Sequence, residues 1–362
     1  MKRKIPQTEA WQQQVDALDR KILELLNRRL TLAAAGEELR RDARAAEAMS
    51  LWESNATERL SAINAGPVRN ETLRAIYREL QAASLAARRK LTVAFFGPSG
   101  TFTHQAALAK FGNRVHYLAR PTIPDVFDAV ARKQATFGVV PVENSTEGAV
   151  THTLDMFADV SVRICAEANM VIHHHLLCRC RKEELQVLYS HPQVFGQCRK
   201  WLRQNLPQVP LVEVSSTTEG TSRCAAEESA GALAGTLAAE LYNLPICESN
   251  IEDLTGNLTR FLVIGDQEAP PTGNDKTSLL FGVKDRVGAL LDSLEPFRQH
   301  GISLTFIESR PSRRKTWEYH FYVDFLGHVS DPAICQALEE LGEHCQYVKI
   351  LGSYPRAIEP VN

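Results

Sequence analysis

Residues 8–90 show the apolar spacing of α-helices and no sign of a strand. From Trp11 the apolar side chains recur every three or four residues, and Arg29 interrupts that series after Leu25. A second periodic run covers residues 49–63, and a third follows Asn70, which is a plausible helix cap. Three helices without a sheet predict an all-α bundle. So small a bundle is expected to complete its core by pairing with a second copy of the chain.

At residue 91 the period changes, because an apolar strand over 91–96 leads through a Gly-Pro-Ser-Gly loop into a helix. The same order of strand, polar loop and helix returns in residues 136–157, 185–202 and 210–228. Repeated units of this kind predict an α/β domain over residues 91–267, and we expect two lobes with a cleft between them.

A linker rich in proline and glycine, "DQEAPPTGNDK", occupies residues 266–276. The segment that follows, 276–357, has apolar patterns in the order β-α-β-β-α-β. This order predicts a ferredoxin-like α+β domain. The chain is therefore expected to be multidomain, and no cofactor-binding fingerprint occurs in it.

Composition narrows the possible classes. The 362 residues are 44% apolar and 23% charged, and 41 basic residues against 43 acidic ones leave a net charge near zero, which disfavours nucleic acid as a partner. No apolar run has the length of a signal peptide core or a membrane span, so we expect a cytoplasmic protein that binds no membrane. The eight cysteines show no paired CxxC spacing, which favours reduced thiols, and three consecutive histidines at 173–175 cannot all face one ion in a strand, so no metal is expected.

Hydroxyl and amide side chains gather at the turns where predicted strands lead into helices: Ser99, Thr101 and Thr103, Asn144 and Ser145, and residues 215–218. Each of these side chains would either cap its own helix or, with the helix N-terminus, bind a small polyanion such as a dicarboxylate. Thr259 and Arg260 begin an apolar strand. The threonine suits positioning or proton donation, and the arginine either covers the sheet end or grips a carboxylate.

Five stretches make the pattern specific: "GPSGTFTHQAA", "VVPVENSTEGAVTHTLD", "YSHPQVFGQC", "NIEDLTGNLTRFLVIG" and "ESRP". In this order they resemble the successive motifs of prephenate dehydratases with a C-terminal ACT domain, over residues 91–357. The resemblance implies a fold like the type II periplasmic binding proteins, with prephenate held between two lobes. It also implies conversion of prephenate to phenylpyruvate in phenylalanine biosynthesis, by loss of CO2 and the ring hydroxyl, without a cofactor.

The resemblance also implies roles for individual residues. Thr259 would be the essential hydroxyl, in a catalytic motif with Arg260 and Phe261. His174 matches a family histidine, although we expect a packed strand residue there. Substrate would contact Ser99, Thr101, Asn144, Ser145, Thr151, Thr153 and Ser216. Phenylalanine would bind as an allosteric inhibitor at Gly288, Ala289, Leu290, Glu308, Ser309, Arg310 and Pro311.

The helical segment resembles the all-helical chorismate mutases that precede many such dehydratases. Arg29, Arg40, Glu53 and Ser84 match residues of the mutase pocket. Other positions depart from the family pattern, with Gln12 and Trp52 where arginines are expected, Met49 at an acidic position and Arg88 at a glutamine. Since the substrate is a dianion, these losses predict weak or absent mutase activity and a domain kept for dimerisation.

The sequence thus predicts a prephenate dehydratase inhibited by phenylalanine, assembled as a homodimer or homotetramer. Three alternatives stay open: a bifunctional chorismate mutase/prephenate dehydratase, an arogenate dehydratase, and a ligand-binding sensor that has lost catalysis. The intact Thr259-Arg260-Phe261 motif speaks against the sensor.

Overall fold

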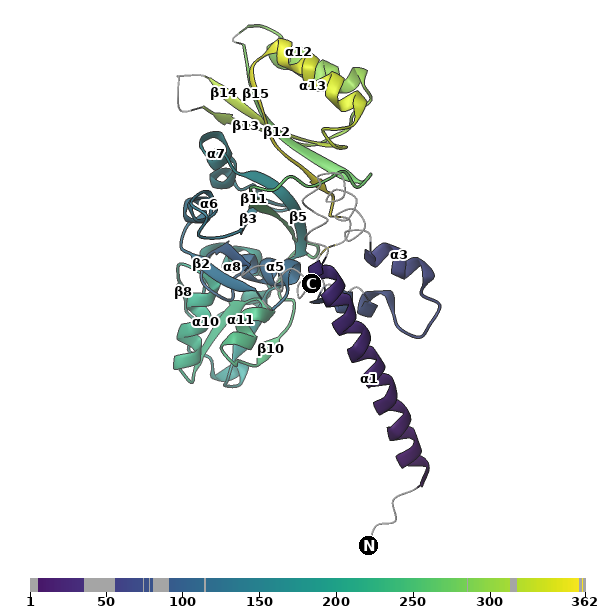
Figure 1. Cartoon of the computed structure of the whole chain (residues 1–362). Coiled ribbons are helices and arrows are strands. Elements are labelled where there is room, and N and C mark those ends of the chain that lie inside the picture. The colour runs from purple at the N-terminus through teal and green to yellow at the C-terminus, as the bar shows by residue number, and fades with distance from the viewer. Residues whose placement is uncertain are drawn as a thin grey trace. The chain divides into compact units, whose positions relative to one another are not determined.

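The structure is a computed structural model and describes residues 6–35, 56–73, 75–77, 79–80, 91–113, 115–284, 286–312, 318–357 and 360. By its internal contacts the chain divides into a helical unit that ends at Leu91 and a larger unit that starts at Thr92, apart from residues 111–115, which group with the first (Figure 1). No helix in the described parts of the chain is long and apolar enough to cross a membrane.

The helical unit begins with α1 (Pro6–Ala35), followed by α3 (Ala56–Ile63) and by helical residues 70–73, 75–77 and 79–80. The predicted helices are present wherever the structure describes them. The apolar series on α1 is uncovered in the single chain, with more than half of the side-chain surface exposed at Trp11, Leu18, Ile22, Leu25 and Leu32. Met49, Trp52 and the other residues of 36–55 and 81–90 lie outside the described residues.

The first lobe of the larger unit is built on a sheet of order β2-β1-β3-β11-β5, with the short β4 added beside β3. Its strands are β1 (Thr92–Phe96), β2 (His116–Arg120), β3 (Phe137–Asn144), β4 (Gly148–Ala149), β5 (Arg163–Val171) and β11 (Leu258–Gly265). Its helices are α5 (Phe102–Phe111), α6 (Ile123–Ala131) and α7 (Thr151–Asp159). Strand β11 lies antiparallel between β3 and β5, although the whole segment that forms the second lobe separates it from both of them in sequence.

The second lobe is the segment between β5 and β11, and its sheet has the order β10-β6-β9-β7-β8. The strands are β6 (His175–Cys178), β7 (Val187–Ser190), β8 (Leu211–Glu213), β9 (Ala230–Ala234) and β10 (Ile246–Glu248). The helices are the short 3-10 turn Lys182–Glu184, α8 (Pro192–Gln197), α9 (Arg199–Asn205), α10 (Thr217–Ala226) and α11 (Thr236–Leu241). Two crossings between the sheets confirm the predicted two-lobed domain.

One expectation about the cysteines was wrong. The structure joins Cys178 of β6 to Cys247 of β10 in a disulfide, with a Cα–Cα distance of 6.2 Å. These strands are antiparallel neighbours with an irregular register at this point, which brings the two side chains together across 69 residues of sequence. Sequence spacing does not reveal such a cross-strand pair, because the pairing is decided by the sheet.

The C-terminal domain has the predicted ferredoxin-like order, with a sheet arranged as β13-β14-β12-β15. Its elements are β12 (Asp275–Val283), α12 (Ala289–Gln299), β13 (Leu304–Pro311), β14 (Tyr319–Leu326), α13 (Pro332–His344) and β15 (Cys345–Pro355). One face of the sheet packs on the two helices, through a core that includes Leu279, Phe297, Phe325 and Leu341.

The opposite face of this sheet has no open surface over its central strands, because it packs against the first lobe. Leu280 and Tyr354 of the C-terminal domain share one core with Leu262 and Ile264 of β11. Strand β12 is accordingly buried over eight successive residues, on both of its faces. The C-terminal domain is thus part of the same packed unit as the first lobe.

Phe127 of α6 tests this shared core, since its ring meets Phe157 of α7 edge to face at 5.1 Å and is fully buried. Phe127→Ala should lower the free energy of unfolding by about 3–5 kcal/mol, because it removes buried apolar surface and leaves a cavity. Urea denaturation measures the change. Leu254→Ala, at a side chain 63% exposed, is the control and should leave the transition within about 0.5 kcal/mol of the parent chain.

Candidate active site

The centre of the candidate site is a pair of side chains on neighbouring strands. Thr259 of β11 stands directly opposite Asn144 at the end of β3. The Asn144 amide nitrogen donates to the Thr259 hydroxyl at 2.7 Å and to the Asn257 side-chain oxygen at 2.7 Å. Asn144 and Thr259, which are 115 residues apart in the sequence, therefore belong to one polar cluster. Sequence order alone does not show this contact.

The Asn144 side chain is held from both ends. Its oxygen accepts hydrogen bonds from the backbone and hydroxyl of Thr146 at 3.0 and 2.6 Å, and from the backbone of Glu147 at 3.1 Å. Because these donors fix which end of the amide carries oxygen, the amide nitrogen must face Thr259. The Thr259 hydroxyl accepts that bond and finds no acceptor for its own proton among the described residues, so it is poised to donate.

The second lobe contributes a chain of polar contacts around Gln197. The Gln197 oxygen lies 2.8 Å from Nε2 of His174, and its nitrogen donates to Glu147 of the first lobe at 3.3 Å. Glu252 accepts from the His174 backbone at 3.0 Å and lies 2.7 Å from Nδ1 of His173. His174 is 1% exposed and therefore packed as expected, but it lies in the connection between β5 and β6 and not in a strand; burial lowers the pKa of its imidazole.

The loop between β1 and α5 contacts the second lobe at Gly100. A side chain at Gly100 would lie 3.3 Å from the Thr218 hydroxyl, and the positive φ of 98° also favours glycine. Thr218 lies in the first turn of α10, is 2% exposed, and its hydroxyl has no partner among the described residues. A buried donor beside a helix N-terminus provides a local site for an anion.

Several hydroxyls that we expected at the substrate serve the fold. Thr153 is fully buried and donates to the Pro141 carbonyl at 2.6 Å, so its expected place in the cleft was wrong. Thr101 donates to the Pro98 carbonyl at 3.0 Å, and Ser216 caps α10 by accepting from Glu219 at 3.1 Å. Ser145 accepts from the Leu258 backbone at 2.9 Å and ties β3 to β11. Ser99 is exposed, and Thr151, half-buried, opens α7.

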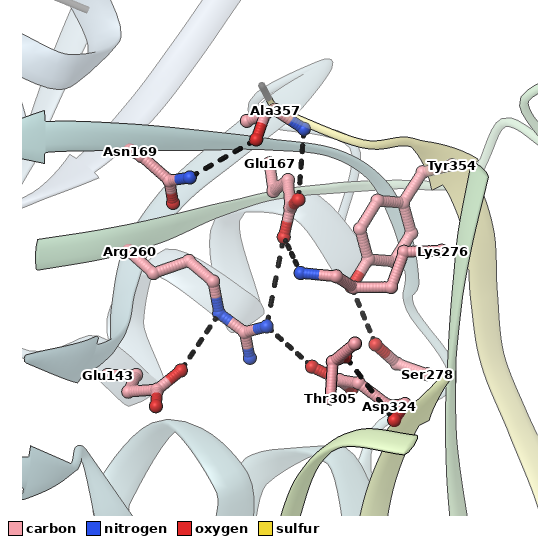
Figure 2. A network of polar contacts seen from close by, with 10 residues as sticks. All are labelled: Glu143, Glu167, Asn169, Arg260, Lys276, Ser278, Thr305, Asp324, Tyr354 and Ala357. Atoms are coloured by element: carbon pink, nitrogen blue, oxygen red, sulfur yellow. Dashed lines mark hydrogen bonds and ion pairs between the residues drawn. The ribbon is translucent and has the colours of Figure 1, made fainter. Parts of the chain in front are cut away.

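Arg260 does not share the face of Thr259. Side chains alternate along a strand, and Arg260 points away from Thr259 toward Asp324, Glu167 and Glu143, at 2.6, 3.7 and 3.4 Å (Figure 2). Burial favours loss of its charge, but Asp324 and Glu167 outweigh burial and keep the pKa of Arg260 above its usual range. Of the two roles that the sequence left open for Arg260, the carboxylates that it contacts in this structure belong to the chain itself. Phe261, 1% exposed, returns to the Thr259 face.

Two residues of this cluster, Gln197 and Asn257, escaped the sequence analysis, and Thr218 was named there only as one hydroxyl of a group. Asn257 lies two residues before Thr259 and so shares its face of the strand, which is a signal that period-two reasoning offers. Gln197 ends α8, and only the packing of the lobes brings it to Glu147. Thr218 stood in the hydroxyl-rich turn 215–218, but which of the four hydroxyls would stay unpaired depends on how α10 begins.

Sequence comparison decides the family. The prephenate dehydratase model matches residues 93–269, with the ACT domain at 277–343 and chorismate mutase type II at 11–89. A bifunctional chorismate mutase/prephenate dehydratase of Aquifex aeolicus is 45% identical over 350 residues, covering 95% of this chain and 97% of that protein. The enzyme of the same name from Pseudomonas aeruginosa is 42% identical and covers 97% and 98%.

The chain belongs to the prephenate dehydratase family. Among solved structures, a prephenate dehydratase from Arthrobacter aurescens in complex with L-Phe is 31% identical with a TM-score of 0.69, covering 75% of this chain and 92% of that one. These matches confirm the order of a chorismate mutase-type helical domain, a dehydratase domain and an ACT domain.

In family terms, the ACT domain holds the second candidate site. Gly288 has a φ of 81° at the start of α12, followed by Ala289, buried, and Leu290, packed on the domain core. Glu308 is half-buried and Ser309 exposed on β13, which ends at Pro311. Arg310 differs from the others, because its guanidinium grips Asp155 of α7 with two bonds of 3.0 and 3.1 Å.

Of the mutase-type pocket, the structure describes Arg29 and Gln12. Arg29 is half-buried with its guanidinium 5.5 Å from the ring centre of Tyr77, and Gln12 is exposed on α1. Arg40, Glu53 and Ser84, together with Trp52, Met49 and Arg88, lie outside the described residues. The pocket assignments there remain predictions.

The buried neutral His174 has a consequence for stability. Its pKa in the folded chain lies below the usual 6.5, so below about pH 6.5 the unfolded chain binds a proton that the folded chain does not. Stability should therefore fall from pH 7 to pH 5, by at most about 1.4 kcal/mol per pH unit for one such group. His174→Asn should show a shallower fall in thermal denaturation. An unchanged slope would show that His174 titrates alike in both states.

Proposed function

We propose that the chain is a bifunctional chorismate mutase/prephenate dehydratase, the alternative that our sequence analysis kept second. The observation that carries this is the similarity to enzymes of that name along 95% or more of both chains, which includes the helical domain. The polar pair Asn144–Thr259 supports the dehydratase half. The mutase-type match over residues 11–89 supports the other.

In the dehydratase step, the bond between the ring and its carboxylate breaks and its electrons enter the ring. The double bonds shift toward the aromatic product, and the ring hydroxyl leaves as water after taking up a proton. Hydroxide is a poor leaving group, so a placed donor accelerates the step. We assign this donor to Thr259, since Asn144 already occupies its acceptor side and leaves its proton for the substrate.

Prephenate also carries two carboxylates that the site must hold. We propose that one of them meets the first turn of α10, where the buried Thr218 hydroxyl and the backbone beside Gly100 come together. A helix N-terminus and an unpaired hydroxyl supply donors without a mobile charge. Arg260 is excluded from this task by its ion pairs.

Thr259→Ala should lower the kcat of prephenate dehydration by about a hundredfold or more, as is typical for removal of one placed donor. Thr259→Ser should retain more activity, because it keeps the hydroxyl. The matched control is Thr122→Ala, which removes a helix cap of α6 and should affect stability only. Spectroscopic detection of phenylpyruvate measures turnover, and a parallel assay with arogenate compares the two substrates. A parent chain that binds prephenate without turning it over would favour the sensor.

The helical domain calls for a revised expectation. The departures at Gln12 and Trp52 predicted little or no mutase activity, but the full-length similarity to bifunctional enzymes favours a working mutase. The physical reason is that a helix turns 100° per residue, so a one-residue error in register moves a cation from the pocket to solvent. A single sequence does not fix that register. Arg88, which stands where the family has a glutamine, is one cation whose role depends on this register.

Arg29→Ala tests the mutase half. Arg29 interrupts the apolar seam of α1 and is half-buried, whereas Arg28 beside it is exposed and points to another side of the helix. Loss of a charge-assisted contact to a dianion should reduce chorismate turnover by about ten- to a hundredfold, and Arg28→Ala should leave turnover within about twofold. Equal effects of the two variants, or a parent chain that consumes no chorismate, would contradict the assignment.

We further propose regulation and assembly. Phenylalanine is the expected inhibitor at the ACT domain, on the support of the relative from Arthrobacter aurescens that was solved with L-Phe and of the open helix start at Gly288. The exposed apolar seam of α1 supports pairing of two copies, as a homodimer or homotetramer. A biosynthetic role in phenylalanine formation fits a cytoplasmic enzyme.

A further inference from the structure

Strand β11 faces two different parts of the molecule. On one face Thr259 meets Asn144 at the candidate active site, and on the other Arg260 reaches into the ACT domain. The same division holds on the neighbouring strand β3, where Asn144 lies with Thr259 and Glu143 with Arg260. Any force on the Arg260 guanidinium therefore acts on the residue next to the catalytic hydroxyl.

The Arg260 guanidinium has little freedom to find other partners. Its residue is 8% exposed, and its shortest contact is to Asp324 of β14, at 2.6 Å. Asp324 itself is 4% exposed, so water does not replace Arg260 as its partner. A buried cation that loses one carboxylate pays a desolvation cost and must be held by the others or move.

A second buried ion pair lies beside the first (Figure 2). Glu167 of β5 accepts from Lys276 of β12 at 2.9 Å and from the Ala357 backbone at 3.0 Å, and it also lies 3.7 Å from Arg260. Glu167 and Lys276 are both buried. Arg260 and Lys276 thus share one carboxylate, and the charge balance of the cluster depends on Asp324.

Asp324 belongs to a hairpin that the candidate effector site also uses. Strand β14 pairs with β13, in which Phe306 stands opposite Asp324 and Glu308 opposite Tyr322. Two residues beyond Glu308, Arg310 holds Asp155 of α7 in the dehydratase lobe. A ligand that shifts β13 would therefore shift Asp324 against Arg260, because paired strands move together.

We propose that Asp324 is a positioning residue for the dehydratase, acting through Arg260 on Thr259, and that phenylalanine at the ACT domain inhibits by disturbing this ion pair. The inference rests on the proposed function. The Asp324–Arg260 pair fixes the start of β11 and with it the direction of the Thr259 hydroxyl. Misplacement of a reacting group by about 1 Å is enough to cost about a hundredfold in rate.

Asp324→Asn is the first test, in the full-length chain with prephenate. The kcat should fall about ten- to a hundredfold while KM changes less than about threefold, because substrate contacts are untouched. Phenylalanine should still bind by calorimetry, but the ratio of kcat without and with saturating phenylalanine should move toward one. Asp324→Glu keeps the charge and should recover part of both properties.

Asp324→Asn leaves Arg260 short of a carboxylate, so a second variant guards against misfolding. The double change Arg260→Met and Asp324→Leu removes both charges of the pair and leaves Glu167 with Lys276. It should fold, by thermal denaturation, and still show the low kcat and the lost response to phenylalanine. Glu340→Gln is the matched control, since Glu340 pairs with His300 inside the ACT domain, 2.9 Å away, and should change neither property.

The outcomes separate cleanly. Parental kcat and parental inhibition in a folded Asp324→Asn or double variant would overturn the inference, and so would a reduced kcat with undiminished inhibition. The same losses in Glu340→Gln would overturn it as well, because the effect would then not be specific to this pair. A parent chain that fails to turn over prephenate would instead overturn the proposed function.

Discussion

A buried positive charge organises the larger unit of this protein. Arg260 is placed by its strand where water is scarce, and a lone charge in such a place is strongly unfavourable. The chain meets this constraint with carboxylates from three other strands, two in the first lobe and one in the ACT domain. Because one of the three belongs to the ACT domain, satisfying the charge also fixes where that domain packs.

The insertion of β11 between β3 and β5 places Arg260 in the middle of the sheet. The chain leaves the first lobe after β5, builds the second lobe, and returns through β11 to the middle of the first sheet. The returning strand therefore joins both lobes and lies between two strands that precede the second lobe in the sequence. Thr259 at its start meets Asn144, and the backbone of Leu258 donates to Ser145, so the start of β11 is tied to the end of β3.

The ACT domain is bound more tightly than a domain joined by a linker alone. Its strand β12 is buried on both faces, and the face of the sheet away from the helices shares a core with β11. Lys349 of β15 adds bonds of 2.7 and 3.0 Å to the Phe157 and Val160 carbonyls at the end of α7. A cation at a helix C-terminus interacts favourably with the helix dipole. Removal of this domain would expose both apolar surface and buried charges of the first lobe.

Period and motif alone determined much of this protein. The change from helical spacing to repeated α/β units at residue 91, and the β-α-β-β-α-β order after the linker, follow from local patterns, because each element must bury its own apolar face. The threonine of the dehydratase motif was also recognisable from its neighbours. What local pattern did not contain is which groups face one another across strands and lobes.

Tertiary structure decided those pairings. It paired Arg260 with Asp324, buried Thr153 in the fold, joined Cys178 to Cys247, and brought Gln197 to Glu147 and Thr218 to Gly100. In the helical domain, the helix register that determines which cations face the pocket is likewise decided by tertiary structure. Side chains far apart in sequence compete for a few partners, and only the packed arrangement of the strands and lobes determines which of those contacts form.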